Sequence, residues 1–240
     1  MTSTPNALQN DRNRLRNAFR LAITFVALLW TIKTAEIIFH LQLIQYGVYP
    51  LRPDALTGIL TGPLIHCSWS HLFTNTLPVV ILGTALFYGY PRSAIPVLTA
   101  VWLGSGAGVW LFARDAYHVG ASGLTFGVMF FLFVIGILRW DKRAIALSMI
   151  IFFLYGSMIW GIFPSEPGIS YESHFFGAVT GTLLAFLLKS YDPIPEEKKY
   201  SWEEETDESF DVVNTEGDLP HEQIMPEPET GDPFNKYKEQ

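Results

Sequence analysis

The stretch that decides the fold is GASGLTFG, residues 120–127, which runs directly into the apolar segment VMFFLFVIGIL, residues 128–138. An apolar segment of this length approaches the ~20 residues that cross a bilayer as a helix. Ser122 lies between glycines at the start of this helix, and glycine allows a sharp turn and the close approach of a second backbone. The pattern predicts a tight turn at Ser122, opening a membrane-spanning helix.

Five further apolar segments surround this one, at 21–45, 71–90, 93–113, 144–163 and 174–189. The last is short for a span, but a helix buried in a bundle can be shorter than one that faces lipid. We therefore expect an all-α membrane protein with six transmembrane helices. An even number of spans puts both termini on one side of the membrane.

The basic residues indicate the orientation. They cluster before the first span, between the second and third, between the fourth and fifth, and after the sixth, whereas the opposite loops hold only Arg52 and Arg114. By the positive-inside rule, both termini are cytoplasmic. Loops 46–65, 114–121 and 164–173 then face outward, and the expected location is the bacterial inner (plasma) membrane.

Charge divides the chain into three parts. Residues 1–189 hold 12 Lys and Arg against 7 Asp and Glu, whereas 190–240 hold 4 against 16. We expect a cytoplasmic segment at 1–19, a six-span body at 20–189, and a disordered acidic cytoplasmic tail at 190–240. The first apolar run is too long for a signal peptide and lacks a small-residue cleavage site. A basic stripe is absent, which excludes nucleic acid as a partner.

The second span opens with polar residues, HCSWSHLFTN at 66–75. His71 and Asn75 are four apart and share a helix face, with His66 about one turn further out. They could bridge helices by hydrogen bonds. A zinc site is disfavoured, because histidines five apart do not share a face and the Glu of a zincin motif is missing. No metal or cofactor is expected.

The sixth span opens with YESHFFGAVTG at 171–181. Gly177 and Gly181 form a small-xxx-small face that lets another helix approach closely, and His174 lies one turn before Gly177 on the same face. A histidine at a helix start is often a capping or interface residue. Here, however, His174, His71 and Ser122 are all expected at the outer ends of their spans.

Other polar residues favour structural roles. Cys67 is the only cysteine, which excludes an internal disulfide, and a small buried thiol is its expected state. Lys33 and Glu36 of the first span are three apart, with His40 one turn on, which predicts a polar stripe containing an internal ion pair.

Taken together, the motifs H-x4-H-x3-N from His66, G-x-S-G at 120–123 and H-x2-G-x3-G from His174 strongly resemble those of the rhomboid intramembrane serine proteases. The resemblance covers residues 20–189 and implies a six-helix rhomboid bundle that cleaves transmembrane protein substrates within the lipid bilayer. It implies a serine nucleophile at Ser122 and a histidine base at His174. His71 and Asn75 match the residues that stabilise the oxyanion, and His66 matches a histidine of more structural character.

The chemistry of the residues agrees with these roles. A serine hydroxyl is a poor nucleophile until a base accepts its proton, and a nearby histidine does so at neutral pH. Phe126, four residues after Ser122, could stack against His174 and fix the ring. The family usually has a tyrosine there. The expected oxyanion donors are His71, Asn75 and the Ser122 backbone N–H, while Gly120 and Gly123 permit the close backbone approach.

Two loop assignments rest on the resemblance alone. Loop 46–65 resembles the membrane-embedded first loop of the family, although the frequent Trp-Arg pair is Leu51-Arg52 here, and the fifth span with loop 164–173 resembles its lateral gate. Two rival functions remain. A catalytically silent rhomboid-like protein binds membrane clients, but such proteins typically lack the serine or the histidine. A small transporter would have paired broken helices in two related halves, which the sequence does not display.

Overall fold

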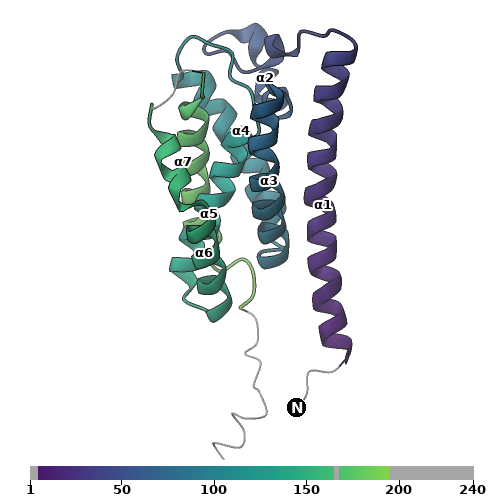
Figure 1. Ribbon diagram of the computed structural model, residues 1–240. Coiled ribbons are helices and arrows are strands. Elements are labelled where there is room, and N and C mark those ends of the chain that lie inside the picture. Colours follow the sequence, from purple (N-terminus) through teal and green to yellow (C-terminus); the bar gives the residue numbers. More distant parts are fainter. Residues whose placement is uncertain (1–4, 165–167, 195–240) are drawn as a thin grey trace, which may run out of the picture. The chain divides into compact units, whose positions relative to one another are not determined.

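The computed structural model describes residues 5–164 and 168–194, which form helices and no strand (Figure 1). The helices are α1 (Pro5–Ile38), α2 (Gly58–Thr61), α3 (Trp69–Gly89), α4 (Ala94–Phe112), α5 (Ser122–Arg139), α6 (Lys142–Tyr155) and α7 (Tyr171–Leu188). Four 3-10 turns accompany them: η1 (Leu43–Tyr46), η2 (Pro53–Ala55), η3 (Gly62–Leu64) and η4 (Gly156–Ile162). The expected all-α class is confirmed.

Five helical stretches within the described ranges are long and apolar enough to cross a membrane. They are Gln9–Ile38 of α1, α3, α4, α5, and Lys142–Ile162, which combines α6 with η4. The expected sixth span, α7, has 18 residues and falls outside this group. Its first turn carries Glu172 and His174, which lower the mean hydropathy of the helix.

α5 is the most deeply buried of the five stretches. Apolar residues cover all of its faces, as is typical of a helix inside a bundle, and Phe131, Leu132 and Ile135 are fully buried. α7 packs along α5 and against α4. Because a Cβ at Gly181 would collide with the Gly127 carbonyl, glycine is what allows α5 and α7 to touch through their backbones. The expected close approach at the small-xxx-small face is confirmed.

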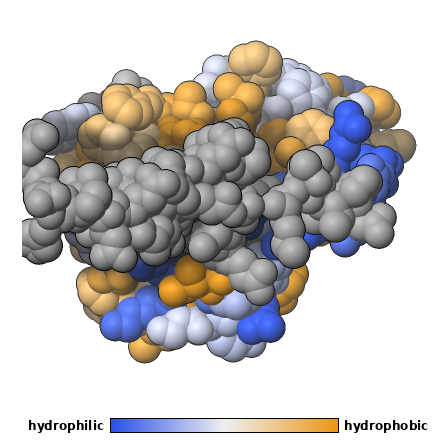
Figure 2. Space-filling model, turned by 90° about the horizontal axis from the view of Figure 1, so that it is seen from below, coloured by the Kyte–Doolittle hydropathy of each residue, from blue (hydrophilic) through white to orange (hydrophobic). Residues whose placement is uncertain are grey.

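The outward faces of the other helices are apolar. Large side chains there are at least 70% exposed, namely Phe73, Phe112, Phe153 and Leu187. Figure 2 shows apolar residues at the surface among hydrophilic ones at the lower end of the molecule. Extensive exposed apolar surface on long helices marks a membrane-facing protein.

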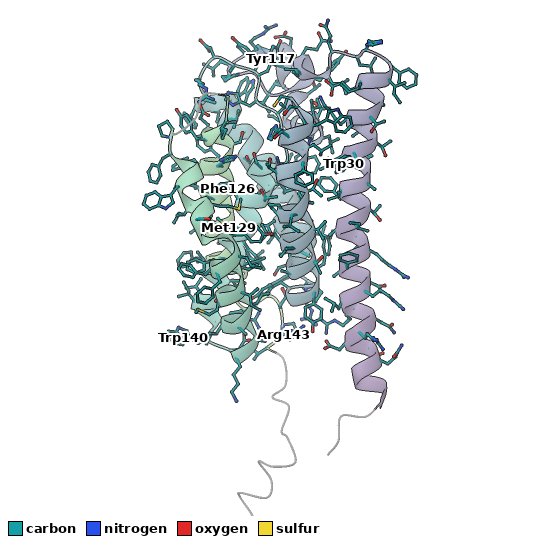
Figure 3. All side chains as sticks on the ribbon, viewed as in Figure 1. Trp30, Tyr117, Phe126, Met129, Trp140 and Arg143 are labelled. Atoms are coloured by element: carbon teal, nitrogen blue, oxygen red, sulfur yellow. The ribbon has the colours of Figure 1, made fainter. Side chains whose placement is uncertain are left out.

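Aromatic and basic residues gather at the ends of the helices. Figure 3 shows Tyr117 at the upper end, Trp140 and Arg143 at the lower end, and Phe126 between them. The Arg143 guanidinium lies 4.4 Å from the centroid of the Tyr88 ring. Such residues favour the membrane–water interface, where an apolar ring and a polar group are both solvated.

The first helix differs from its predicted span, because α1 covers Pro5–Ile38 rather than 21–45. Arginine is a good helix former, so the helix continues through the basic residues of the segment 1–19 that was expected to be separate. It ends before His40, which has a left-handed φ of 49°, and η1 follows. The sequence stays apolar beyond that turn, so hydropathy alone misplaced the end of the helix.

The packed body also extends past its predicted end at residue 189. Asp192 is 3% exposed and its carboxylate accepts hydrogen bonds from the backbone N–H groups of Arg92 at 2.8 Å and Ser93 at 3.0 Å. Arg139 donates to the Asp192 carbonyl oxygen at 2.9 Å. A buried, fully bonded carboxylate is part of the fold, so the expected disordered tail does not begin at 190. Residues 195–240 lie outside the described residues.

Candidate active site

Ser122 and His174 are in direct contact. Ser122 is the first residue of α5, His174 lies in the first turn of α7, and Ser122 Oγ is 2.8 Å from His174 Nε2. Ser122 is half-buried and His174 is 7% exposed. The fold thus joins two polar residues that are 52 positions apart.

A backbone carbonyl sets the tautomer of His174. Its Nδ1 lies 2.8 Å from the carbonyl oxygen of Gly161 in η4. A carbonyl oxygen only accepts, so Nδ1 carries the proton. Nε2 then presents its lone pair to the Ser122 hydroxyl, which is the state a general base requires.

Phe126 fixes the plane of the same imidazole. Its ring stacks on His174 with 4.0 Å between centroids and 5° between planes, which confirms the stacking expected from the spacing to Ser122. Phe126 is 4% exposed. The imidazole is therefore held by a hydrogen bond at one nitrogen and by an aromatic ring on its face.

Glycine is required on both sides of Ser122. Gly120 has a φ of +116°, and a Cβ there would lie 2.8 Å from His71 Nε2. A Cβ at Gly123 would lie 3.0 Å from the carbonyl oxygen of Ser173, and one at Gly177 would collide with the Gly123 carbonyl. The close approach that brings His174 to Ser122 therefore depends on glycines in both helices.

His71 and Asn75 share a face of α3, as expected. Asn75 Nδ2 donates to the His71 carbonyl oxygen at 2.9 Å, and the Ser68 side chain caps the helix by accepting from the His71 N–H at 3.1 Å. The His71 ring lies beside Gly120, two residues before Ser122. The Asn75 amide bonds within α3, and none of the hydrogen bonds among the described residues links it to α5.

His66 packs against His71 and is 1% exposed. Its ring meets the His71 ring edge to face at 5.1 Å, and its Nε2 accepts from the Ala121 N–H at 3.4 Å. Its buried Nδ1 has no hydrogen-bond partner among the described residues. Burial, with the nearby His71 and Lys33, lowers the pKa of His66 to about 4, so the ring is neutral at pH 7.

The predicted ion pair in the first helix is confirmed and does more than brace α1. Lys33 Nζ lies 2.9 Å from Glu36 Oε2, and both side chains are buried. The same ammonium donates to the carbonyl oxygens of His66 at 2.9 Å and Cys67 at 3.5 Å. His40 does not extend this stripe, because it is exposed in the turn after α1.

The expectation of a buried thiol at Cys67 is wrong. Cys67 is exposed, and its Sγ lies 3.3 Å from His71 Nδ1. The residue belongs to the short connection between η3 and α3, where the chain runs along the surface before the helix begins. Apolar character alone does not reveal such a position.

Two residues that hold the site were not predicted. Gly161 acts through its carbonyl, and a backbone atom leaves no signature in a sequence. His118 is buried between α4 and α5, where its Nε2 donates to the Arg114 carbonyl at 3.0 Å and its Nδ1 lies 2.6 Å from Ser170 Oγ. Ser170 in turn caps α7 by accepting from the Ser173 N–H. The position of His118, four residues before Ser122 in a polar loop, was the sequence signal that could have indicated its role.

Burial lowers the pKa of His118, which favours the neutral ring that these two bonds need. Arg114 adds a second connection to the same helix end, donating to the Ile169 carbonyl at 2.6 Å. The start of α7, and with it His174, is thus tied to the loop that leads to Ser122.

The fold and the site define a helical integral membrane protein with a serine–histidine pair at the junction of two helices. The rhomboid domain family model matches residues 53–191. An uncharacterised protein of Mycobacterium tuberculosis is 32% identical over 196 residues, covering 78% of this chain and 82% of the relative. RHOMBOID-like protein 7 of Arabidopsis thaliana is 28% identical over 151 residues, covering 61% and 45%. The chain belongs to the rhomboid family.

Proposed function

We propose that this protein is an intramembrane serine endopeptidase that cleaves transmembrane segments of membrane proteins. The carrying observation is the 2.8 Å contact between Ser122 Oγ and a His174 ring whose tautomer leaves Nε2 free to accept a proton. A catalytically silent member of the family has no need of this arrangement. In the proposed peptidase, α7 serves as the sixth transmembrane span.

The arrangement supports acyl transfer. As Ser122 Oγ attacks the scissile carbonyl carbon, its proton passes to His174 Nε2, and the carbonyl oxygen becomes negative. His174 then gives this proton to the leaving amine, and the peptide bond breaks. A water molecule hydrolyses the acyl-enzyme in the same manner, with His174 as base, and releases Ser122.

The negative oxygen needs donors in an apolar site. The Ser122 backbone N–H and the His71 ring, which lies beside Gly120, are the nearest candidates. Asn75 has two amide protons, of which one is used within α3, so the other is available.

Fluorophosphonate labelling of the purified protein in detergent tests the nucleophile. Wild type should be labelled, as should Ser157→Ala, which changes an exposed serine of η4. Ser122→Ala should not be labelled. Equal labelling of wild type and Ser122→Ala would exclude Ser122 as the nucleophile. A folded wild-type protein that is not labelled but still binds other membrane proteins would favour the alternative function, a catalytically silent rhomboid-like protein.

The proposed orientation has cytoplasmic termini in the bacterial inner membrane, with the site opening outward. The only cysteine, Cys67, is exposed four residues before His71, so it reports the side on which the site opens. A membrane-impermeant maleimide should label intact spheroplasts at Cys67, and Cys67→Ser should abolish the signal. Labelling of Cys67 only after lysis would indicate the opposite orientation, with the site opening to the cytoplasm. Residues 165–167 of the expected lateral gate lie outside the described residues.

A further inference from the structure

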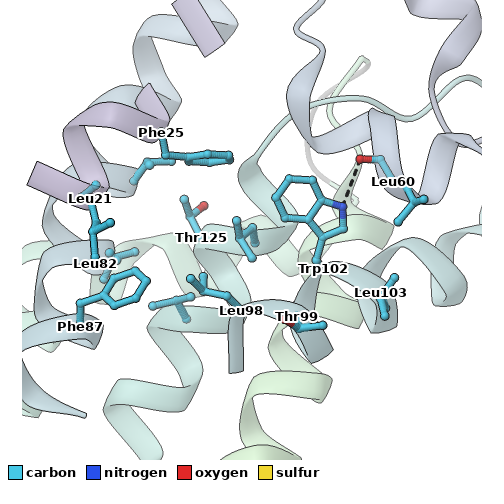
Figure 4. Close-up of a pocket in the computed structure, with 15 residues that line it drawn as sticks. Leu21, Phe25, Leu60, Leu82, Phe87, Leu98, Thr99, Trp102, Leu103 and Thr125 are labelled. Carbon is cyan, nitrogen blue, oxygen red and sulfur yellow. Dashed lines mark hydrogen bonds between the residues drawn. The ribbon is translucent and has the colours of Figure 1, made fainter. Parts of the chain in front are cut away.

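A second hollow lies beside the candidate active site without including Ser122 or His174. It has a volume of about 530 Å³, and α1, α3, α4 and α5 form its walls, with Leu60 of α2 at one end (Figure 4). The rings of Phe25 and Trp102, both in its lining, pack edge to face with 6.0 Å between their centroids. Leu124 and Thr125 of α5 belong to its wall, so it reaches the helical turn that begins at Ser122.

The wall contains three polar side chains, Thr99, Trp102 and Thr125, and the last two already make hydrogen bonds within the protein. Trp102 Nε1 already donates to the carbonyl oxygens of Ile59 at 3.1 Å and Leu60 at 3.2 Å. The Thr125 hydroxyl donates to the Ser122 carbonyl oxygen at 2.8 Å. The remaining lining is almost entirely aliphatic and aromatic. A polar ligand would lose its hydration here without replacement, whereas a hydrocarbon would lose nothing.

The hollow opens towards the membrane. Leu21, Leu60 and Leu103 at its edge are 54%, 60% and 44% exposed. The helices that carry Leu21 and Leu103 are long and apolar enough to span a bilayer, so the medium at this edge is lipid. The volume holds roughly one turn of an α-helix of 10–12 Å diameter, which excludes a transmembrane segment as its occupant.

We propose that this hollow binds an acyl chain of a membrane phospholipid. The chain enters between α1 and α4 and contacts Leu124 and Thr125, on the turn of α5 that follows Ser122. The acyl chain supplies dispersion contacts that the residues of the wall would lack if the hollow were empty. The binding does not depend on the proposed peptidase activity.

Photocrosslinking of the full-length protein tests the site. The protein is reconstituted in phospholipid vesicles that contain a phosphatidylcholine with a diazirine near the end of one acyl chain, and the labelled residues are identified by mass spectrometry. Leu124 and Val128 are 7% and 3% exposed, so label on them requires a chain inside the hollow. We expect label on both, and unlabelled phospholipid should compete for it. Ser122→Ala should be labelled equally, which separates this proposal from the fate of the nucleophile.

A matched pair of variants adds a second test. Leu103→Trp fills the edge of the hollow, whereas Leu111→Trp makes the same change on α4 at a residue of similar exposure, 47%, outside it. Leu103→Trp should reduce label on Leu124 and Val128 at least fivefold and Leu111→Trp should not. Thr99→Phe, also in the lining, serves if Leu103→Trp does not fold.

Label confined to outward-facing residues, in equal amounts in Leu103→Trp and Leu111→Trp, would overturn the proposal. Labelling of Leu124 and Val128 by a diazirine fatty acid but not by the phospholipid would overturn the assignment of the occupant to a phospholipid.

Discussion

His174 and Gly161 are joined by a hydrogen bond from Nδ1 to a backbone carbonyl oxygen, 2.8 Å long. Any residue at 161 would supply that oxygen, and what glycine adds is space. A Cβ at 161 would lie 2.8 Å from Phe126 Cζ and 3.4 Å from His174 Nδ1. η4 can therefore orient the His174 imidazole only if residue 161 has no side chain.

Gly161→Ala should lower the rate of cleavage of a transmembrane test substrate by about 10- to 100-fold, because the Phe126–His174 stack must shift. Gly156→Ala is the control, since the three atoms nearest to its Cβ would all belong to the half-exposed Phe152 ring, at 3.3–3.7 Å. Initial rates in detergent or in vesicles provide the measurement. Equal rates for the two variants would show that the packing at 161 does not orient the base.

Ser122→Ala and His174→Ala should each abolish this cleavage while leaving the fold intact. The double variant should be no slower than either single variant, because the two residues act as one unit. Rates are compared with the uncatalysed background, and helical circular dichroism checks the fold. Turnover above background by either single variant would assign the nucleophile or the base to another residue.

Asn75→Ala should reduce turnover by roughly 10- to 1,000-fold, since one oxyanion donor of several is lost. His71→Ala should act similarly. The measurement pairs initial rates with thermal unfolding, because Asn75 also donates to the His71 carbonyl oxygen. Unchanged rates together with lowered thermal stability would identify both residues as structural.

The boundary of the tail yields a prediction on stability. Asp192→Ala should lower the free energy of unfolding by about 2 kcal/mol, because the bonds to Arg92 and Ser93 are charge-assisted. Asp115→Ala, at an exposed residue, is the control.

Truncation after Lys199 retains Asp192 and should leave the cleavage rate within about twofold of that of the full chain. A hundredfold loss of activity in a truncated protein that inserts correctly would indicate a regulatory tail.

Stability should fall as the pH drops from about 6.5 to about 4. The unfolded state binds protons on His66 and His118 near pH 6.5, whereas burial lowers both pKa values in the fold, that of His66 to about 4. The unfolded state therefore binds more protons in this window, and lowering the pH favours it. Thermal midpoints from pH 8 to 4 test this. His66→Phe should show a smaller decline, and an identical decline would contradict the role of His66.

The lengths of the apolar segments predicted the helical class, and spacing along a helix predicted the Lys33–Glu36 pair. The Phe126–His174 stack was predicted from the spacing of Phe126 to Ser122 together with the pairing of Ser122 and His174 that the family resemblance implies. The sequence misplaced the ends of α1 and of the packed body. Those ends depend on a left-handed turn at His40 and on a carboxylate bonded to residues about 100 positions away. The Gly161 carbonyl escaped notice for a related reason, since tertiary contacts of backbone atoms leave no periodic pattern.

The three bonds of the Lys33 ammonium have a mechanical consequence. Two of them, to the carbonyl oxygens of His66 and Cys67, anchor α1 to the connection that leads into α3, so displacing α1 would break both bonds. The third, to Glu36, lies within α1 and would move with the helix. A hydrogen bond to a charged group contributes about 1.5–3 kcal/mol, so this displacement is unfavourable. We expect α1 to stay in place, so that a transmembrane substrate helix has to enter the bundle from another side.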